Sequence, residues 1–165
     1  LTGSTIADLT SIAAYPANPD GHDLLPTLNI PPNVTDNYGQ RFRGYLHPTV
    51  TGNYRFSITG DDQCRLLLST DATAGNAADI ASVPSAVPLW SDNTFPQQNS
   101  AQITLVAGKR YYIEALMKAG GGGDHLAQKR PWRDLRHVVR VHSDARPAAD
   151  LPGVLRSLQS RQLDG

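Results

Sequence analysis

The strictest pattern in the chain is a stretch in which hydrophobic residues occupy every second position. Within Asn53–Thr59, the residues Tyr54, Phe56 and Ile58 alternate with polar ones, and a period of two places all three on the same face of a β-strand. We therefore expect a strand over 53–59 that buries these three side chains and exposes its other face to water.

Further short strands are predicted on both sides of it. The segment 41–46 is a candidate strand that ends at His47-Pro48, because proline cannot donate to a sheet ladder, and we expect it to form a hairpin with 53–59. The clearest predicted hairpin joins 101–105 to 110–116 through a turn at Ala107-Gly108-Lys109. Weaker candidate strands cover 64–69 and 80–83, and 84–99 is predicted to be a loop rich in Pro, Asn and Gln.

Composition agrees with an all-β fold of modest size. Glycine and proline contribute 14 and 12 of the 165 residues, a share that favours turns over long helices. The length suits one domain, and no apolar run is long enough to span a membrane. Many short strands between turn signals predict an antiparallel β-sandwich or a barrel-like fold.

Charge divides the chain near residue 127. The first 127 residues contain 7 basic and 11 acidic residues, whereas 128–165 contain 8 basic and 4 acidic ones. Asp134 and Asp144 interrupt the basic tail and Trp132 is its one aromatic residue, so we expect a solvated face and no nucleic-acid partner. The predicted organisation is a β-sandwich domain over 1–127 and an atypical basic tail over 128–165, with a last strand at 138–141.

Two neighbouring carboxylates, Asp61 and Asp62, follow the best predicted strand directly. Adjacent acids repel each other unless a cation lies between them, and Ca²⁺ takes carboxylates and backbone carbonyls from irregular loops as ligands. The glycine-rich loop Gly120–Gly123 ends in Asp124, which offers another carboxylate. An Asp-Asp pair at a strand end also serves as an ordinary turn.

Several separated blocks together resemble the PA14 domain family, in particular its bacterial extracellular members. The blocks are Tyr45-Leu46-x-Pro48, Gly52-x-Tyr54-x-Phe56-x-Ile58-x-x-Asp61-Asp62, Leu66-x-Leu68-Ser69-Thr70-Asp71, Leu105-x-Ala107-Gly108-Lys109-Arg110-Tyr111-Tyr112-Ile113-Glu114-Ala115 and Gly120–Asp124. The resemblance covers about residues 1–126. It implies a β-sandwich or barrel-like module, generally non-catalytic, that binds carbohydrate within a larger extracellular or cell-surface protein.

The family also implies a site. Its best-understood members are calcium-dependent lectins in which two consecutive aspartates joined by a cis peptide bond hold the ion, and Asp61 and Asp62 match that pair. A side-chain ligand from a later loop corresponds to Asp124, and backbone carbonyls correspond to Leu126 and Gln128. Vicinal hydroxyls of a hexose would bind the ion and the carboxylates together.

Other residues near these ligands are expected to contact the glycan. We assign Gln63, Gly123 and His125 to this group, together with an aromatic platform supplied by Trp90, with Phe95 and Trp132 as alternatives. The expected cofactor is Ca²⁺ and the expected partners are cell-surface glycans or polysaccharides, bound by a monomeric module.

The tail departs from the family, because 127–134 does not alternate as a last core strand would. Leu151-Pro152-Gly153 resembles the family's usual closing Ile-Pro-Gly, and 128–150 is expected to be partly disordered.

Two other functions remain open at this point. A glycosidase would need two carboxylates about 5–10 Å apart, such as Asp61 with Glu114 or Asp124, although no motif for acyl transfer accompanies the histidines. A structural spacer or protein-interaction module without a sugar site is the second alternative. Cys64 falls in an alternating apolar run and is expected to be buried and inert. Asn33-Val34-Thr35 has the form of an N-glycosylation acceptor, which has meaning in a eukaryotic secretory route.

Overall fold

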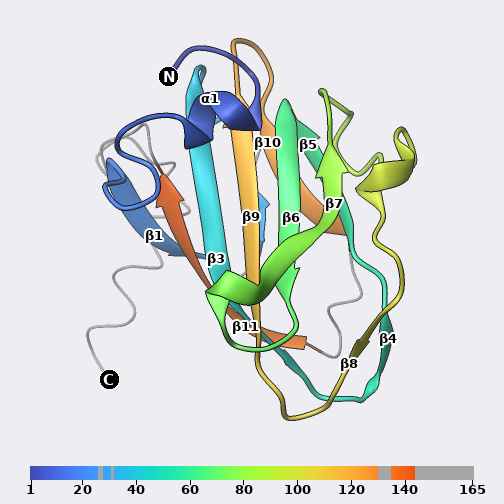
Figure 1. Cartoon of the computed structure of the whole chain (residues 1–165). Helices are drawn as coiled ribbons and strands as arrows, with labels where there is room; N and C mark the ends of the chain where they lie inside the picture. The colour runs from blue at the N-terminus through green and yellow to red at the C-terminus, as the bar shows by residue number, and fades with distance from the viewer. Residues whose placement is uncertain (26–27, 31, 130–134, 144–165) are drawn as a thin grey trace, which may run out of the picture.

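Two facing antiparallel sheets make up the fold. The computed structural model describes residues 1–25, 28–30, 32–129 and 135–143. The larger sheet has six strands in the order β1-β11-β3-β9-β6-β7 (Figure 1). Their bounds are Gly21–Leu25 for β1, Leu135–Ser143 for β11, Tyr38–Pro48 for β3, Tyr111–Ala119 for β9, Gln63–Ser69 for β6 and Ala77–Val83 for β7. The prediction of an all-β antiparallel sandwich is thus confirmed.

The smaller sheet has three strands in the order β2-β10-β5 and lies behind the larger one in Figure 1. Its strands are β2 (Asn29–Ile30), β10 (His125–Lys129) and β5 (Ser57–Asp61). A separate two-stranded ribbon pairs β4 (Gly52–Tyr54) with β8 (Ile103–Leu105). Short 3-10 helices cover Ala74–Asn76 and Pro96–Gln98.

The hydrophobic core lies between the two sheets. Phe42, Leu66 and Ile113 contribute from the larger sheet and Ile58 and Leu126 from the smaller one, and all belong to one buried cluster. The predicted inward residues Tyr54, Phe56 and Ile58 are at most 7% exposed. Cys64 is fully buried as predicted, and burial raises the pKa of its thiol well above the ordinary range.

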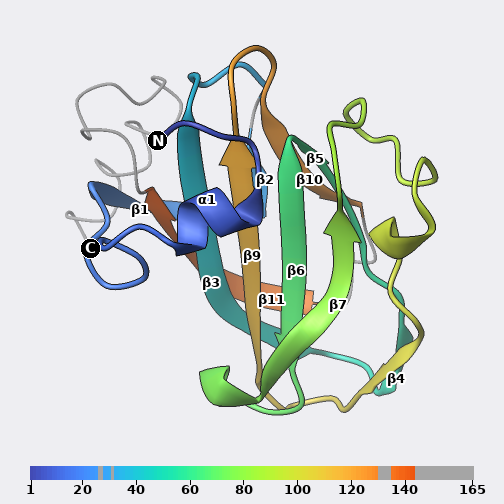
Figure 2. The ribbon, with the colours of Figure 1, turned by 45° about the horizontal axis from the view of Figure 1, so that its top comes forward.

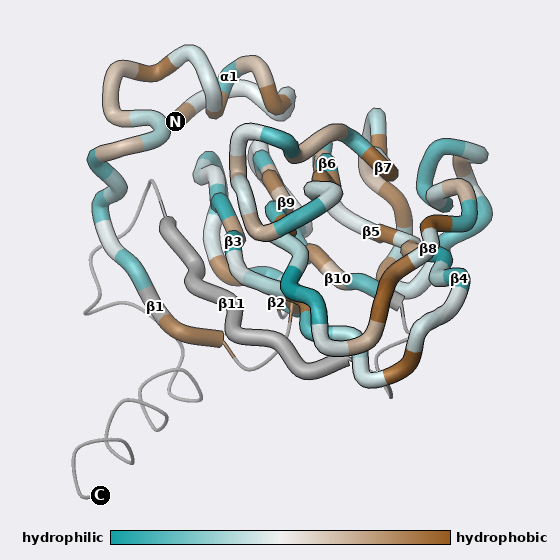
Figure 3. The backbone as a smooth tube through the Cα atoms, turned by 60° about the horizontal axis from the view of Figure 1, so that its bottom comes forward, coloured by the Kyte–Doolittle hydropathy of each residue, from teal (hydrophilic) through white to brown (hydrophobic). Residues whose placement is uncertain are grey.

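The outer face of the larger sheet is partly covered by the N-terminal segment. Helix α1 (Ile6–Thr10) crosses in front of β3 and β9 (Figure 2), and Ile6 and Leu9 pack on Leu116 of β9 in a second cluster. Figure 3 shows α1 on one side of β3, β9 and β6, and β2, β10 and β5 on the other. A capping box between Thr5 and Asp8 begins the helix.

Both predicted hairpins were wrong. The expected partners 41–46 and 53–59 do not pair, because β3 lies between β9 and β11. The expected hairpin of 101–105 with 110–116 is absent too, since β8 pairs with β4 and β9 lies between β3 and β6. Alternation identifies the buried face of a strand but carries no information about its neighbour. Here β4 and β5 lie outside the sheet that contains β3, and β8 lies outside the sheet that contains β9.

The single strand predicted over 53–59 is divided into β4 and β5. The division falls at Phe56, whose backbone exchanges hydrogen bonds with Ser100 instead of a strand: its N–H donates to the Ser100 hydroxyl at 2.9 Å, and its carbonyl accepts from the Ser100 N–H at 2.8 Å. The chain therefore passes from the β4–β8 ribbon to the smaller sheet without losing its alternation.

The segment beyond residue 127 contributes to both sheets. The predicted domain boundary falls inside β10, and the strand expected at 138–141 is the longer β11, which pairs with β3 along its whole length and with β1 on its other side. Of the stretch 128–150 expected to be partly disordered, 135–143 forms this strand. Residues 130–134 and 144–165, with Trp132 and the Leu151-Pro152-Gly153 motif, lie outside the described residues.

Candidate functional site

Three connections between the two sheets meet at one end of the sandwich. The chain passes from the smaller to the larger sheet between β2 and β3 and again at Asp61–Gln63 between β5 and β6, and it returns at Gly120–Asp124 between β9 and β10. This end lies at the top of Figure 1. Loops of a sandwich gather at its ends, so residues far apart in sequence come together here.

The Asp61–Asp62 pair forms the corner between β5 and β6. Its peptide bond is cis, as the family resemblance implied. The carboxylate of Asp62 accepts a hydrogen bond from the Gly120 N–H at 2.7 Å, and the Asp62 N–H donates to the Lys118 carbonyl at 3.2 Å. Asp62 is therefore tied to the connection between β9 and β10.

Asp124 braces the loop before β3. Asp124 ends the glycine loop and is 1% exposed. The carboxylate accepts hydrogen bonds from the N–H groups of Val34, at 2.8 and 3.0 Å, and of Thr35, at 2.9 Å. The Asp124 carbonyl accepts from the Asn33 N–H at 3.0 Å. This carboxylate thus has a structural task besides any contact with a ligand.

Asp61 lies between other charged groups. A Cβ atom at Gly123 would come within 3.1 Å of the Asp61 carboxylate and within 3.9 Å of the Asn33 side-chain oxygen, so both oxygens border the same small space. Burial raises the pKa of Asp61, and the charges of Asp62 and Asp124 raise it further while His125 opposes them. The carboxylates of Asp62 and Asp124 are therefore close enough to repel that of Asp61.

His125 faces the same end from the start of β10. It pairs in register with Asp61 and is 5% exposed. Burial lowers its pKa, against the opposing effects of Asp61, Asp124 and a hydrogen bond to the Val87 backbone. Its Nε2 is buried without a hydrogen-bond partner.

The side chains at this end offer mainly oxygen atoms to a cation. Within the described residues, no group of three or more His, Cys, Asp and Glu side chains is arranged to hold a metal ion. Ca²⁺, however, also accepts amide and carbonyl oxygens, and the Asn33 oxygen lies beside the space that Asp61 borders. The donors therefore suit a hard cation bound by the aspartate pair together with oxygens of other kinds.

Gln63 and Lys118 tie the N-terminal segment to this corner. The Gln63 side chain accepts from the Ile6 N–H at 3.0 Å and donates to the Pro84 carbonyl at 3.0 Å. Lys118 is fully buried, and its ammonium donates to the Gly3 carbonyl at 2.6 Å and the Ala119 carbonyl at 2.5 Å. Burial lowers the pKa of Lys118, while Asp8 and Asp62 counteract it. Gln63 was predicted to contact a ligand, and its side chain is used inside the fold.

Trp90 lies in a loop that begins beside the aspartate pair. The Val87 N–H donates to the Gly60 carbonyl at 3.1 Å, which fixes the loop to the residue before Asp61. Trp90 is 48% exposed and has a positive φ of 67°. Phe95, the alternative platform, is partly buried against the core.

Leu126 and Gln128 lie inside β10. Leu126 is fully buried and stands opposite Ile30 of β2 and Gly60 of β5. Gln128 is 5% exposed, and its side-chain amide is buried without a hydrogen-bond partner. Both backbones belong to the smaller sheet rather than to the glycine loop.

Three residues near the site were not singled out as site residues from the sequence. Asn33 and Val87 are brought there by the connections around them, and no local pattern signals this. Lys118 does carry a signal, because a lysine between Met117 and Ala119, in a strand whose only other charged residue is Glu114, indicates a buried ammonium group.

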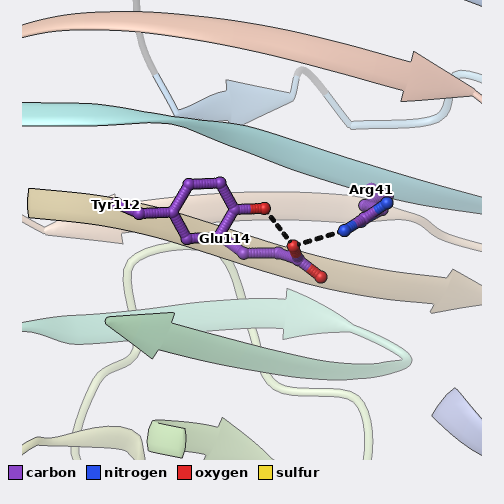
Figure 4. A network of polar contacts seen from close by, with 3 residues as sticks. All are labelled: Arg41, Tyr112 and Glu114. Carbon is purple, nitrogen blue, oxygen red and sulfur yellow. Dashed lines mark hydrogen bonds and ion pairs between the residues drawn. The ribbon is translucent and has the colours of Figure 1, made fainter. Parts of the chain in front are cut away.

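Glu114 belongs to a separate polar network on the outer face of the larger sheet. Its carboxylate accepts from Arg41 at 2.8 Å and from the Tyr112 hydroxyl (Figure 4). Gln63, two residues after Asp61, pairs with Lys118, which is four residues along β9 from Glu114, or roughly 13 Å of strand. The Glu114 carboxylate is thus engaged by Arg41 and Tyr112 in a network apart from the Asp61–Asp62 corner.

Comparison with known proteins gives a family and several relatives. The PA14 domain model matches residues 18–138. A Mus musculus protein, N-acetyl-beta-glucosaminyl-glycoprotein 4-beta-N-acetylgalactosaminyltransferase 1, is 30% identical over 129 residues, which are 75% of this chain and 12% of that protein. Fibrocystin-L of Mus musculus is 32% identical over 87 residues, which are 53% of this chain and 2% of that protein. Fibrocystin of Canis lupus familiaris is 27% identical over 131 residues, which are 73% of this chain and 3% of that protein.

The chain therefore spans an eighth or less of the length of these relatives. Among its described residues, none of the helices has the length and apolar character needed to cross a membrane.

Proposed function

Because the chain belongs to the PA14 domain family, we propose that it is a non-catalytic carbohydrate-binding module of a larger extracellular protein. In this proposal it binds glycans with Ca²⁺ held at the Asp61–Asp62 pair. The catalytic part of any enzyme that carries such a module would lie elsewhere in the parent protein.

The observation that supports this proposal best is the environment of Asp61. Its carboxylate faces a small space beside Gly123, and burial raises its pKa, with a further contribution from the charges of Asp62 and Asp124. Like charges held together in a folded protein favour a bound cation, because the cation removes their repulsion. The partly exposed position of the pair leaves room for a ligand from solution.

Each residue has a defined task in the proposal. Asp61 and Asp62 hold the ion, with the amide oxygen of Asn33 next to Asp61. Asp124 fixes the loop that carries Asn33. When bound, Ca²⁺ supplies a positive centre to which vicinal sugar hydroxyls attach. The carboxylates accept hydrogen bonds from the same hydroxyls, and charge assistance strengthens those bonds.

The exposed ring of Trp90 provides a surface for the apolar face of a sugar. Its loop is anchored at Val87 to Gly60, and at its other end Gln98 donates to the carbonyls of Ile58 and Ser91. A ring on an anchored loop loses little conformational freedom on binding. Gly123 and His125 border the same end of the domain.

The relatives support the class of ligand and the location. One is named as an enzyme that acts on an N-acetyl-beta-glucosaminyl glycoprotein, and glycoproteins are displayed mainly outside the cytosol. The chain corresponds to a small part of each relative. We accordingly propose an extracellular or cell-surface location and a role as one module among others.

Thermal unfolding with and without calcium tests the proposal. The melting temperature of the wild-type chain is expected to rise in excess Ca²⁺ relative to EDTA, since a ligand present at a hundredfold excess over Kd stabilises the native state by about 2.7 kcal/mol. The rise should disappear in Asp61→Asn/Asp62→Asn. Asp79→Asn is the matched control, because Asp79 is an exposed aspartate of β7 that forms an ion pair with Arg65 of β6. This variant should keep the full rise in melting temperature.

A glycan array on the calcium-loaded protein then tests carbohydrate binding. Signals that require Ca²⁺ and vanish in the double variant support the proposal. Equal melting temperatures in calcium and EDTA, with no glycan bound, would favour the structural spacer instead.

A further inference from the structure

We propose that Asn33 is an N-glycosylation site and that the glycan attached there covers the Asp61 end of the domain. The inference rests on the proposed extracellular location reached through a eukaryotic secretory route, because attachment requires that route. It goes beyond the proposed function, since it places a covalent sugar where a bound one is expected.

The sequence and exposure of this segment meet the requirements for attachment. Asn33-Val34-Thr35 carries threonine two residues after asparagine with no proline between them. Asn33 is exposed, whereas Val34 and Thr35 are half-buried. A glycan on Asn33 therefore projects into solvent and is compatible with the folded domain.

The backbone around Asn33 directs its side chain toward the candidate site. Asn33 has a φ of 60°, a left-handed conformation that asparagine tolerates better than most residues. Its N–H donates to the Asp124 carbonyl, and the next two N–H groups donate to the Asp124 carboxylate. The acceptor segment is thus fastened along the residue that follows Gly123.

The side-chain oxygen of Asn33 shows where a glycan would begin. It lies 3.9 Å from the position of a Cβ atom at Gly123, and the Asp61 carboxylate lies 3.1 Å from the same position. The nitrogen that accepts the sugar is bonded to the same carbon as this oxygen. The first sugar residue would therefore start beside Asp61 and limit the access of larger ligands.

The chemical step is a glycosyl transfer. The Asn33 Nδ2 forms a bond to the anomeric carbon of an oligosaccharide carried on a lipid pyrophosphate. The bond between that carbon and the pyrophosphate oxygen breaks, its electron pair leaves with the lipid pyrophosphate, and the amide nitrogen loses one proton.

The first test is the mass of the full chain secreted from mammalian cells behind a signal peptide. The wild-type chain should carry one N-linked glycan that peptide N-glycosidase removes. Thr35→Ala destroys the acceptor but leaves Asn33 in place, and it should be secreted without a glycan. Thr35→Ser is the matched control and should stay modified. A wild-type chain secreted at its unmodified mass would overturn the proposal.

The second test measures coverage without relying on calcium or glycan binding. Since Cys64 is fully buried, Asp61→Cys would supply the reactive thiol at this end, and its reaction with a polyethylene-glycol maleimide reports access. We expect labelling at least fivefold slower in the glycosylated protein than in the Thr35→Ala background. Ala78→Cys, at an exposed residue of the edge strand β7, should label equally in both.

Equal rates at Asp61→Cys in the two backgrounds would overturn the covering role. If Asp61→Cys is not secreted, Asp36→Cys replaces it, because Asp36 lies in the same loop, is exposed, and accepts a hydrogen bond from the Gly122 N–H. Failure of calcium binding would refute the proposed function but would leave both of these readouts unchanged, so the two failures are distinguishable.

Discussion

The carboxylate of Asp124 accepts a hydrogen bond from the backbone N–H of Val34 at 2.8 Å, across 90 residues of sequence. It also accepts from the Thr35 N–H at 2.9 Å, and the side chain is almost completely buried. One carboxylate thus joins the connection between β9 and β10 to the connection between β2 and β3. The relative position of these two loops depends on Asp124.

Replacing Asp124 should therefore destabilise the fold even without a ligand. Asp124→Ala removes the acceptor for two backbone N–H groups, and a hydrogen bond to a charged group contributes about 1.5–3 kcal/mol. We expect a loss of at least about 3 kcal/mol in the free energy of unfolding by urea in EDTA. Asp124→Asn keeps one accepting oxygen and should lose about half as much. An Ala variant as stable as the wild type would contradict the bracing role.

Asp61→Asn should have the opposite effect in the absence of calcium. The substitution removes a charge that Asp62 and Asp124 repel, while it keeps nearly the same shape. We expect the melting temperature in EDTA to rise by roughly 2–4 °C, the shift that about 1 kcal/mol produces in a chain of this length. In excess Ca²⁺ the order should reverse, with the wild type melting higher. A lower melting temperature of the variant in EDTA would show that Asp61 is stabilised by contacts other than a cation.

The aspartates differ in how much of their role could be predicted from the sequence. The adjacent pair Asp61 and Asp62 was found from a motif, because both members are neighbours in the chain. The bracing contacts of Asp124 depend on Val34 and Thr35, which no periodicity connects to it. The approach of Asn33 to the same place depends on the crossing of β2 to β3, and strand alternation does not reveal crossings.

The fold shows the same division between local and distant information. The inward positions of Tyr54, Phe56 and Ile58 were predicted correctly, since a period of two is a local property. The partners of those strands were predicted incorrectly, because the turns that precede 53–59 and 110–116 redirect the chain without pairing the strands on either side. Non-local pairing in a sandwich is decided by the core as a whole.

Acid should weaken the fold through His125. Burial lowers the pKa of His125 below its usual 6.5. At a pH between the lowered pKa and 6.5, the imidazole therefore binds a proton in the unfolded chain but not in the folded one. Stability contributed by the neutral imidazole is present above pH 6.5 and is lost as pH falls toward the lowered pKa. We expect the free energy of unfolding in EDTA to fall between pH 7 and pH 5, and to fall less in His125→Gln. The same slope in both proteins would contradict this assignment.

The network around Glu114 predicts a large effect far from the aspartate pair. The side chains of Arg41 and Glu114 are only 14% and 9% exposed. Glu114→Ala would leave the Arg41 guanidinium without its anion and should cost about 3–5 kcal/mol, as removal of one partner from a buried ion pair does. Tyr112→Phe removes one hydrogen bond and should cost about 1 kcal/mol.

Urea unfolding of these variants and of Arg41→Met/Glu114→Leu measures what the Arg41–Glu114 ion pair contributes to the free energy of unfolding. The double variant leaves no uncompensated charge, so it should be more stable than Glu114→Ala. The opposite order would show that the cost of Glu114→Ala arises from lost packing. Calcium should stabilise each variant that folds by the same amount as it stabilises the wild type, because the network lies on a part of β9 away from the Asp61–Asp62 pair.

Alanine substitutions at two glycines of one loop separate an effect on the calcium site from an effect on the stability of the fold. A methyl group at Gly123 would come within 3.1 Å of the Asp61 carboxylate and 3.9 Å of the Asn33 oxygen, whereas nothing lies within 4 Å of a methyl group at Gly121. Neither of these glycines has a positive φ, so alanine is compatible with the backbone at both.

We therefore expect Gly123→Ala to weaken calcium binding at least tenfold in isothermal titration calorimetry, a change of about 1.4 kcal/mol. Gly121→Ala should bind as the wild type does, and both variants should melt near the wild-type temperature in EDTA because surface substitutions change stability by about 0.5 kcal/mol or less. If Gly123→Ala kept the wild-type affinity, the ion would have to lie away from the space between Asp61 and Asn33.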